Sequence, residues 1–452
     1  MKRIILCLLV LPFTLLSANM TIAQNTFIMD QFTADPSARV FGDRVYVFPS
    51  HDIPYTEDHG RFGWFCMEDY HVFSSPNLTD WTDHGVIVDQ KNVAWANPEG
   101  YSMWAPDCIF RNGKYYFYFP TFVGDTVKYG RGFGIGVAIA DKPEGPYKPE
   151  DGPIENVHGI DPNVFIDNDG QAYLYWAIGN IFAARLKVNM VELDSEPVIL
   201  GDLPAEGLKE GPYLFERNGL YYLTYPHVEN RTERLEYAVG DNPLGPFKVT
   251  GVIMDESPTG CWTNHQSVIE FKGQWYLFYH HNDLSPNFDK SRSIRVDSLF
   301  FNEDGTIQKV IPTLRGVGLT KATKKIQMDR YSMKSDQGVS IEFLDEQDTV
   351  NRSEGWKTIF NSKDAWIQYN SVDFGTKELK TTHVKTMSET GGTVQISINS
   401  LKGPVLAEVI VPGGGQWKTV SAAVFSFIPG IHNLFVMPED QSAVEIDWLN
   451  FE

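Results

Sequence analysis

Residues 108–119 read CIFRNGKYYFYF: a short apolar run, an Asn-Gly pair and a second run rich in aromatic residues. An Asn-Gly pair between two such runs is a strong signal for a β-hairpin, because both turn positions need positive φ angles. The pattern recurs as RVFGDRVYVFPS at 39–50, VFIDNDGQAYLYW at 164–176, YLFERNGLYYLTY at 213–225 and VIEFKGQWYLFYH at 268–280. The turn glycines lie about 50 to 70 residues apart, which suits four-stranded propeller blades with long loops. Five hairpins therefore predict five blades.

The composition agrees with an all-β chain and narrows the class of partner. Aromatic residues make up 13% of the 452 residues, with 38 glycines and 26 prolines, as expected for short strands joined by tight turns. The formal net charge of −20 opposes binding to nucleic acid or to an anionic membrane surface. A neutral sugar polymer is not repelled by this negative charge.

The first 23 residues predict a secretory signal peptide. Lys2 and Arg3 form a basic start, residues 4–16 an apolar run, and Thr21 to Ala23 a cleavage site of small residues. Cleavage after Ala23 would release a secreted or periplasmic protein without membrane insertion. No later segment has the length and apolar character of a membrane span.

Polar residues stand just before each hairpin. The five approaches read TADPS with Asp35, WAPD with Asp107, HGIDPN with Asp161, KEGP with Glu210 and TNHQS with His265. The first strand of each propeller blade lines the central channel, so residues at equivalent positions converge on one axial pocket. Single Asp-Pro and Asp-Gly pairs are common turn formers. Asp35, Asp161 and Glu210 each stand beside a Pro or Gly turn in the same blade register, and these three carboxylates point instead to chemistry.

Hydrolysis of a glycosidic bond with inversion needs two carboxyl groups. One is protonated and donates to the leaving oxygen, and the other is ionised and activates a water on the opposite face of the sugar. Burial and a nearby like charge keep the acid protonated near neutral pH. Three axial carboxylates fit this task, because the third can tune the other two.

The motifs quoted above, together with FNEDGTI at 301–307, resemble glycoside hydrolase family 43, whose members are inverting enzymes with a five-bladed β-propeller. Carried over by position, the resemblance implies that Asp35 is the general base and Glu210 the general acid. It implies that Asp161 raises the pKa of Glu210 and orients it. No cofactor for catalysis is expected.

The resemblance also suggests residues that contact the substrate. Trp104 matches an aromatic residue that shapes the sugar pocket, with core packing as the alternative. Arg292 matches an arginine on the substrate side. His265 falls where the family places a histidine near an axial metal ion or water, and an ordinary hydrogen-bonding histidine is the alternative.

The last quarter of the chain predicts a β-sandwich. The basic stretch KATKKI begins at Lys321, and we expect residues 320–328 to form a linker between a propeller at 24–319 and a sandwich at 329–452. Strand-like alternation follows, as in WIQYNSVD at 366–373 and TVQISIN at 393–399. Together with the closing IDW, these runs resemble a family 6 carbohydrate-binding module with a jelly-roll fold.

That second resemblance implies a structural calcium site formed by Asp329, Glu342 and Asp447. It also exposes departures from a sugar-binding module. Trp417 aligns with a core tryptophan, Glu445 stands where a binding asparagine is usual, and Trp356 is the best remaining platform for stacking on a sugar. The sequence leaves open whether this domain binds carbohydrate or only braces the propeller.

The leading functional hypothesis is an exo-acting glycosidase that removes terminal or side-chain pentosyl units from plant polysaccharide, as an α-L-arabinofuranosidase or a β-D-xylosidase. Three alternatives remain. They are a galactan-cleaving exo-β-galactosidase on the same scaffold, a noncatalytic carbohydrate-binding propeller and, as a weaker third option, a retaining phosphorylase or transferase.

Overall fold

The computed structural model describes residues 25–452 apart from 58, 205, 286, 345–355 and 442. The predicted signal peptide at 1–23 lies outside the described residues and stays a prediction. Within the described part of the chain the regular elements are strands, with a single 3-10 turn, η1 (Gln90–Asn92). No helix there is long and apolar enough to cross a membrane. The all-β prediction is confirmed.

Residues up to 299 form five antiparallel sheets, one for each predicted hairpin. Blade one contains β1 (Phe32–Phe41), β2 (Arg44–Asp52), β3 (Asp69–Ser75) and β4 (Thr82–Asp89); blade two contains β5 (Asp107–Arg111), β6 (Lys114–Phe122), β7 (Phe133–Ala140) and β8 (Lys148–Pro149). Blade three contains β9 (Ile160–Ile166), β10 (Ala172–Ile178), β11 (Asn180–Leu186) and β12 (Val198–Ile199); blade four contains β13 (Tyr213–Arg217), β14 (Leu220–Val228), β15 (Glu233–Gly240) and β16 (Lys248–Met254). Blade five contains β17 (Ser267–Phe271), β18 (Gln274–His281) and β19 (Ser293–Leu299).

The predicted hairpins have the expected turns. The five turn glycines all have positive φ, namely Gly42, Gly113, Gly170, Gly219 and Gly273. Asn112 and Asn218 also have positive φ, 51° and 54°, so both central positions of these two turns take the left-handed conformation.

Blade five differs from the prediction of four strands, because its sheet has three. Asn25 occupies part of the edge where a fourth strand would pair. Its side chain accepts the backbone N–H of Val296 in β19 at 2.9 Å and donates to the carbonyl of the same residue at 3.1 Å. A single side chain thus satisfies the peptide groups of the outer strand at this point.

The inner strands form a closed ring, in which β1, β5, β9, β13 and β17 contact one another in this order and β17 returns to β1. Buried polar groups join neighbouring blades. Asp107 of β5 accepts hydrogen bonds from Ser37 Oγ of β1 at 2.5 Å and from Asn163 Nδ2 of β9 at 3.1 Å. Asn163 Oδ1 accepts the N–H of Leu214 in β13 at 2.9 Å, and Ser267 Oγ of β17 donates to a carbonyl of β1 at 2.5 Å. This ring gives the axial residues a rigid frame.

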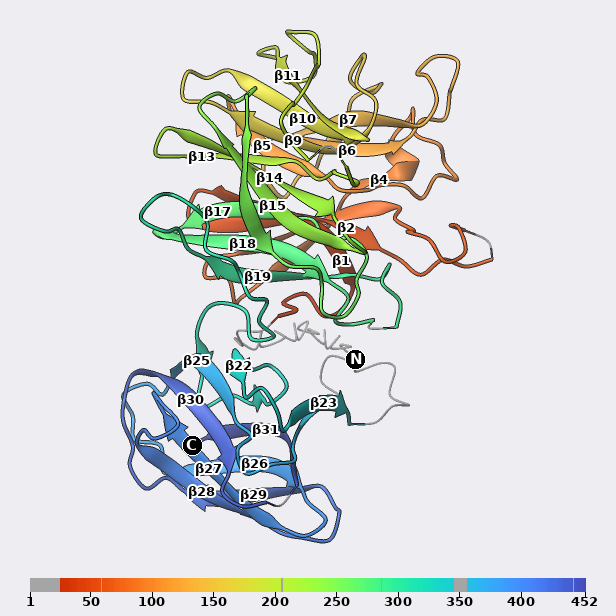
Figure 1. The fold of residues 1–452 in the computed structure, drawn as a ribbon. Helices are drawn as coiled ribbons and strands as arrows, with labels where there is room; N and C mark the ends of the chain where they lie inside the picture. Colours follow the sequence, from red (N-terminus) through yellow and green to blue (C-terminus); the bar gives the residue numbers. More distant parts are fainter. Residues whose placement is uncertain (1–24, 58, 205, 286, 345–355, 442) are drawn as a thin grey trace, which may run out of the picture.

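The C-terminal domain is a sandwich of two six-stranded sheets with one apolar core between them. One sheet contains β20 (Thr320–Lys321), β22 (Met333–Lys334), β25 (Ile367–Asp373), β27 (Gly392–Ile398), β28 (Val405–Val411) and β30 (Ile431–Pro438). The other contains β21 (Ile326–Gln327), β23 (Val339–Phe343), β24 (Trp356–Phe360), β26 (Thr381–Met387), β29 (Lys418–Ala423) and β31 (Val444–Phe451). Figure 1 shows the blades in red to green and this domain in cyan to blue.

The prediction of a linker at 320–328 is wrong. These residues contain β20, which pairs with β25, and β21, which pairs with β31. Ala322, Ile326 and Met328 are fully or almost fully buried in the sandwich core, while the intervening lysines face solvent. The lysines disguised a strand-like alternation, so the sandwich begins about nine residues earlier than expected.

Candidate active site

The three carboxylates that the sequence singled out line one axial pocket. Its volume is about 160 Å³, and every blade contributes to its wall. The lining residues are Asp35, Trp64, Phe65, Met67, Trp104, Ala105, Ile160, Asp161, Glu210, Trp262, Thr263, Asn264, His265 and Arg292. All six residues predicted for the propeller site are therefore in one place, although up to 257 residues separate Asp35 and Arg292 in sequence.

Local backbone irregularity directs the two aspartates inward. Asp35 lies where the pairing of β1 with β2 shifts register, and Asp161 lies at a similar shift between β9 and β10. Both residues have positive φ, 49° and 57°, which is uncommon for a residue other than glycine. Bulges of this kind re-aim a side chain, and such strain is frequent at functional sites. The two Asp-Pro pairs in the sequence mark these bulges.

Asp35 is held as a carboxylate by buried donors. Arg292 Nη1 donates to Asp35 Oδ1 at 2.8 Å, and Ser50 Oγ donates to Asp35 Oδ2 at 2.6 Å. Burial alone would raise the pKa of Asp35, but Arg292, His280 and His265 outweigh it and lower the pKa to about 2. Asp35 is thus ionised throughout the neutral range, as a general base must be.

Arg292 is fixed from its other side by Asp52, which the sequence analysis missed. Asp52 accepts three hydrogen bonds from Arg292: from the backbone N–H at 2.9 Å, from Nε at 2.9 Å and from Nη2 at 2.8 Å. The ring of Phe65 lies 4.7 Å from the guanidinium carbon. The guanidinium group of Arg292 therefore holds the proposed base, Asp35, and is itself held by Asp52.

Asp161 has the opposite electrostatic environment. Its Oδ2 accepts the backbone N–H of Gly211 at 2.9 Å, which ties it to the residue after Glu210. Burial raises the pKa of Asp161 to about 7. The charge of His265 opposes this rise most strongly, and the charges of Glu210 and Asp35 add to it. The two aspartates on equivalent bulges therefore differ widely in proton affinity, because only Asp35 contacts the arginine.

Glu210 shares its surroundings with a second glutamate, Glu233, at the start of β15. Burial raises the pKa of Glu210, and a hydrogen bond from the Glu233 side chain opposes that rise. Glu233 is fully buried, and its Oε2 accepts the N–H of Asn264 at 2.6 Å. Burial and the charge of Glu210 raise the pKa of Glu233 well above its usual range, so Glu233 stays protonated and donates to Glu210.

Aromatic residues form much of the remaining wall. Trp104 faces the pocket as predicted, and its ring packs against Phe133 with centroids 4.6 Å apart. Trp64 and Trp262 line the same pocket from other loops and are partly exposed, at 38% and 36%. Aromatic faces beside buried acids suit the recognition of a sugar ring.

His265 lies in the pocket with its Nδ1 3.8 Å from Asp35 Oδ1. In the described part of the chain it belongs to no group of three close metal-binding side chains. An axial metal ion or water beside it stays a prediction.

The predicted calcium ligands of the sandwich are only partly brought together. Asp329 and Asp447 are both buried, and burial together with Asp447 raises the pKa of Asp329 to about 6 despite its ion pair with Arg330. Glu342 instead lies 59% exposed, and the three side chains do not form a close ligand group among the described residues. Each of these two carboxylates is paired with a cationic side chain, Asp329 with Arg330 and Asp447 with Lys385 at 2.7 Å, and calcium here stays a prediction.

A closed five-bladed propeller with three acids in an axial pocket is the arrangement of a glycoside hydrolase. The sequence profile described as glycosyl hydrolases family 43 matches residues 25–307, and that of carbohydrate binding module (family 6) matches residues 331–452. The chain belongs to glycosyl hydrolases family 43 and is a glycosidase of this inverting family.

Individual relatives agree with this assignment. Xylosidase/arabinosidase 43A of Humicola insolens is 35% identical over 332 residues, covering 62% of this chain and 97% of the relative. The crystal structure of CoXyl43, a β-xylosidase/α-arabinofuranosidase from a compost metagenome, aligns with a TM-score of 0.56 and 35% identity over 64% of this chain and 97% of that one. An arabinoxylan arabinofuranohydrolase of Bacillus subtilis covers 96% of this chain and 99% of its own, at 25% identity and a TM-score of 0.54.

Proposed function

We propose that this chain is an exo-acting pentosidase that removes α-L-arabinofuranosyl or β-D-xylosyl units from the ends or side chains of plant polysaccharide. The observation that carries the proposal is the pairing, in one small pocket, of an ionised Asp35 with a protonatable Glu210. Drug-sized ligands need cavities of about 300 Å³ or more, so a pocket of about 160 Å³ suits a single sugar ring. The names of the relatives support the choice of pentose.

In the proposed reaction, Asp35 takes a proton from a water molecule as that water attacks the anomeric carbon. The glycosidic C–O bond breaks on the opposite face, and the leaving oxygen takes the proton of Glu210. Asp161 holds the backbone beside Glu210 and disfavours its ionisation. The product sugar has the inverted configuration.

Export completes the proposal. The sequence at 1–23 supports cleavage of a signal peptide, and a substrate polymer outside the cytoplasm agrees with it. N-terminal sequencing of the protein recovered from its native host would give residue 24 as the first residue, and recovery of the intact N-terminus would contradict export by this route.

Two variants test the assigned roles separately. Glu210→Ala should lose about 10²–10⁴-fold in kcat on xylobiose but keep most of its activity on a dinitrophenyl pentoside, whose leaving group needs no proton. Asp35→Ala should lose activity on both substrates. Asp169→Asn, an exposed acid in the turn of blade three, is the matched control and should behave as wild type.

The sugar is identified with a panel of aryl arabinofuranosides, xylosides and galactosides, with NMR detection of the first-formed anomer. Preference for a pentoside with inverted product supports the proposal. A strong preference for galactosides would overturn the pentose assignment, and a retained anomer would overturn the roles of Asp35 and Glu210.

A further inference from the structure

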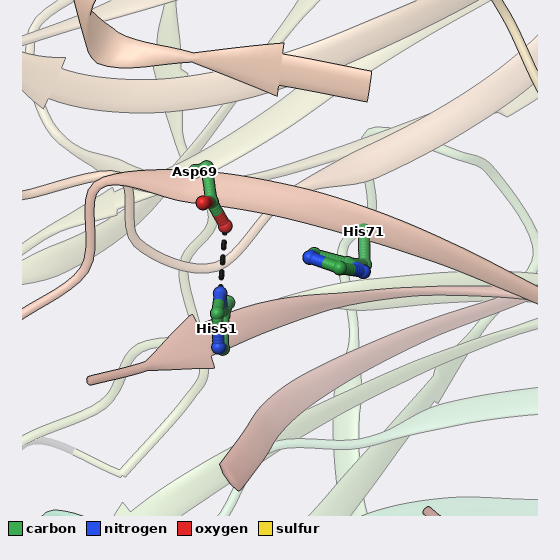
Figure 2. Close-up of side chains that lie close together, drawn as sticks. All are labelled: His51, Asp69 and His71. Atoms are coloured by element: carbon green, nitrogen blue, oxygen red, sulfur yellow. Dashed lines mark hydrogen bonds and ion pairs between the residues drawn. The ribbon is translucent and has the colours of Figure 1, made fainter. Parts of the chain in front are cut away.

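Three side chains capable of binding a metal ion meet on blade one, outside the axial pocket. They are His51 near the end of β2 and Asp69 and His71 at the start of β3. The register of these antiparallel strands pairs Val47 with Phe73, and its continuation sets His51 opposite Asp69. Asp69 and His71 are two positions apart, so both side chains emerge on one face of the sheet. Figure 2 shows the three side chains turned toward one another.

The separation of the three groups is close to that of a metal site. One ligand atom from each residue lies within 4.8 Å of the others, and His51 Nδ1 is 2.7 Å from Asp69 Oδ1. Ligand atoms of a tetrahedral zinc site are about 3.3 Å apart, from bond lengths of about 2.0–2.2 Å. Small side-chain rotations therefore suffice to bring all three onto one ion.

Asp83 provides the support that a metal-binding histidine usually has. Both of its carboxylate oxygens lie 3.0 Å from His71 Nδ1. A carboxylate on one ring nitrogen fixes the tautomer and orientation of the imidazole and leaves the other nitrogen as the ligand. His71 can thus bind an ion through Nε2 without giving up its bond to Asp83.

We propose that His51, Asp69 and His71 form a binding site for a divalent transition-metal ion, with Zn²⁺ as the best match. Two imidazoles and one carboxylate suit zinc, whereas calcium requires a larger set of oxygen ligands. The three side chains are 14% to 18% exposed, so an ion can enter and a water molecule can complete its coordination.

The proposed metal site lies next to residues that hold or line the axial pocket, so metal binding would affect the active site. His51 is adjacent to Asp52, which holds Arg292. His51 and Asp69 also stand at the two ends of the segment that supplies Trp64 and Phe65 to the pocket wall. A metal ion would fasten these strand ends together and stabilise the folded state, since the unfolded chain lacks the assembled site.

The test uses the full chain, treated with EDTA and then titrated with ZnCl₂ in a calorimeter, with metal content measured after dialysis. We expect saturable binding of one ion and a higher Tm with zinc. His71→Ala should weaken binding at least 100-fold, and Asp83→Asn by about 10-fold, because its loss frees the ring. His84→Ala is the matched control, since His84 is an exposed histidine of the same blade that contacts Ser74.

Absence of saturable zinc binding would overturn the proposal. So would equal affinities of wild type and the His71→Ala variant, because the ion would then occupy another site. Asp83 is exposed, so we expect the Asp83→Asn variant to fold. Its zinc affinity therefore still tests the proposal if the His71→Ala variant does not fold. A calcium titration that matched the zinc titration in affinity would also contradict a site built on imidazole.

Discussion

Replacing Asp161 by asparagine should stabilise the protein while impairing catalysis. Asp161 is buried beside Glu210, and its pKa is raised from 3.8 to about 7. Between these two pH values the folded chain holds a proton that the unfolded chain has released. The contribution of Asp161 to the stability of the wild type therefore falls as the pH rises from about 4 to about 7.

The size of this loss follows from the two proton affinities. A tenfold change in affinity is about 1.4 kcal/mol, so the raised pKa corresponds to a loss of about 4 kcal/mol above pH 7. This figure is an upper bound, because protons redistribute between Asp161 and Glu210. Asparagine carries no charge, and its side-chain oxygen still accepts the N–H of Gly211. Asp161→Asn should therefore exceed the wild type in Tm by up to about 8 °C at pH 8 and by little at pH 4.

Differential scanning calorimetry at pH 4, 6 and 8 checks this prediction, with kcat measured on the same samples. Asp169→Asn controls for the exchange of an aspartate for an amide on the same blade. A Tm difference that stays constant across the pH range would refute the assigned environment of Asp161. A variant less stable than the wild type at pH 8 would refute it as well.

Three further predictions concern the frame around the acids. Glu233→Met removes the hydrogen bond that opposes the raised pKa of Glu210, so the alkaline limb of its kcat profile against pH should move to higher pH. Glu233→Gln keeps a hydrogen-bond donor and should move this limb less. Identical pH profiles for the wild type and Glu233→Met would contradict the prediction. Asp107→Ala leaves Arg39 without its buried partner and should cost about 3–5 kcal/mol in urea unfolding, where a cost below about 1 kcal/mol would be inconsistent. Trp262→Ala should raise KM by about tenfold with little change in kcat, and a loss confined to kcat would argue against its contact with the sugar.

Much of the active site could be predicted because its residues carry local signals. Asp35 and Asp161 stand in Asp-Pro pairs that mark bulges, and Glu210 stands before a Gly-Pro turn at a similar distance from a hairpin. The repeat period then placed Asp35 and Asp161 on inner strands and Glu210 just before one. The boundary of the sandwich was missed, because the exposed lysines around Ala322 and Ile326 conceal two short strands that only pairing with β25 and β31 stabilises.

Other parts of the site have no local signal. Glu233 belongs to an ordinary charged stretch, ERLEY. Its pKa is raised only because β15 buries it beside Glu210. His51, Asp69 and His71 are unremarkable in sequence, since no metal-binding motif spaces them in this way. Their grouping depends on the register of two strands.

The sequence by itself determined the number of blades, the appended sandwich and the identity of three axial acids, since hairpin turns and bulges depend on residues close together in the chain. Tertiary structure decided which acid is ionised. Asp35 and Asp161 have the same local sequence, Asp-Pro on a bulged inner strand, yet the pKa of one is about 2 and that of the other about 7. Charge acts through space, and the arginine that separates these values is 257 residues away from Asp35 in the chain.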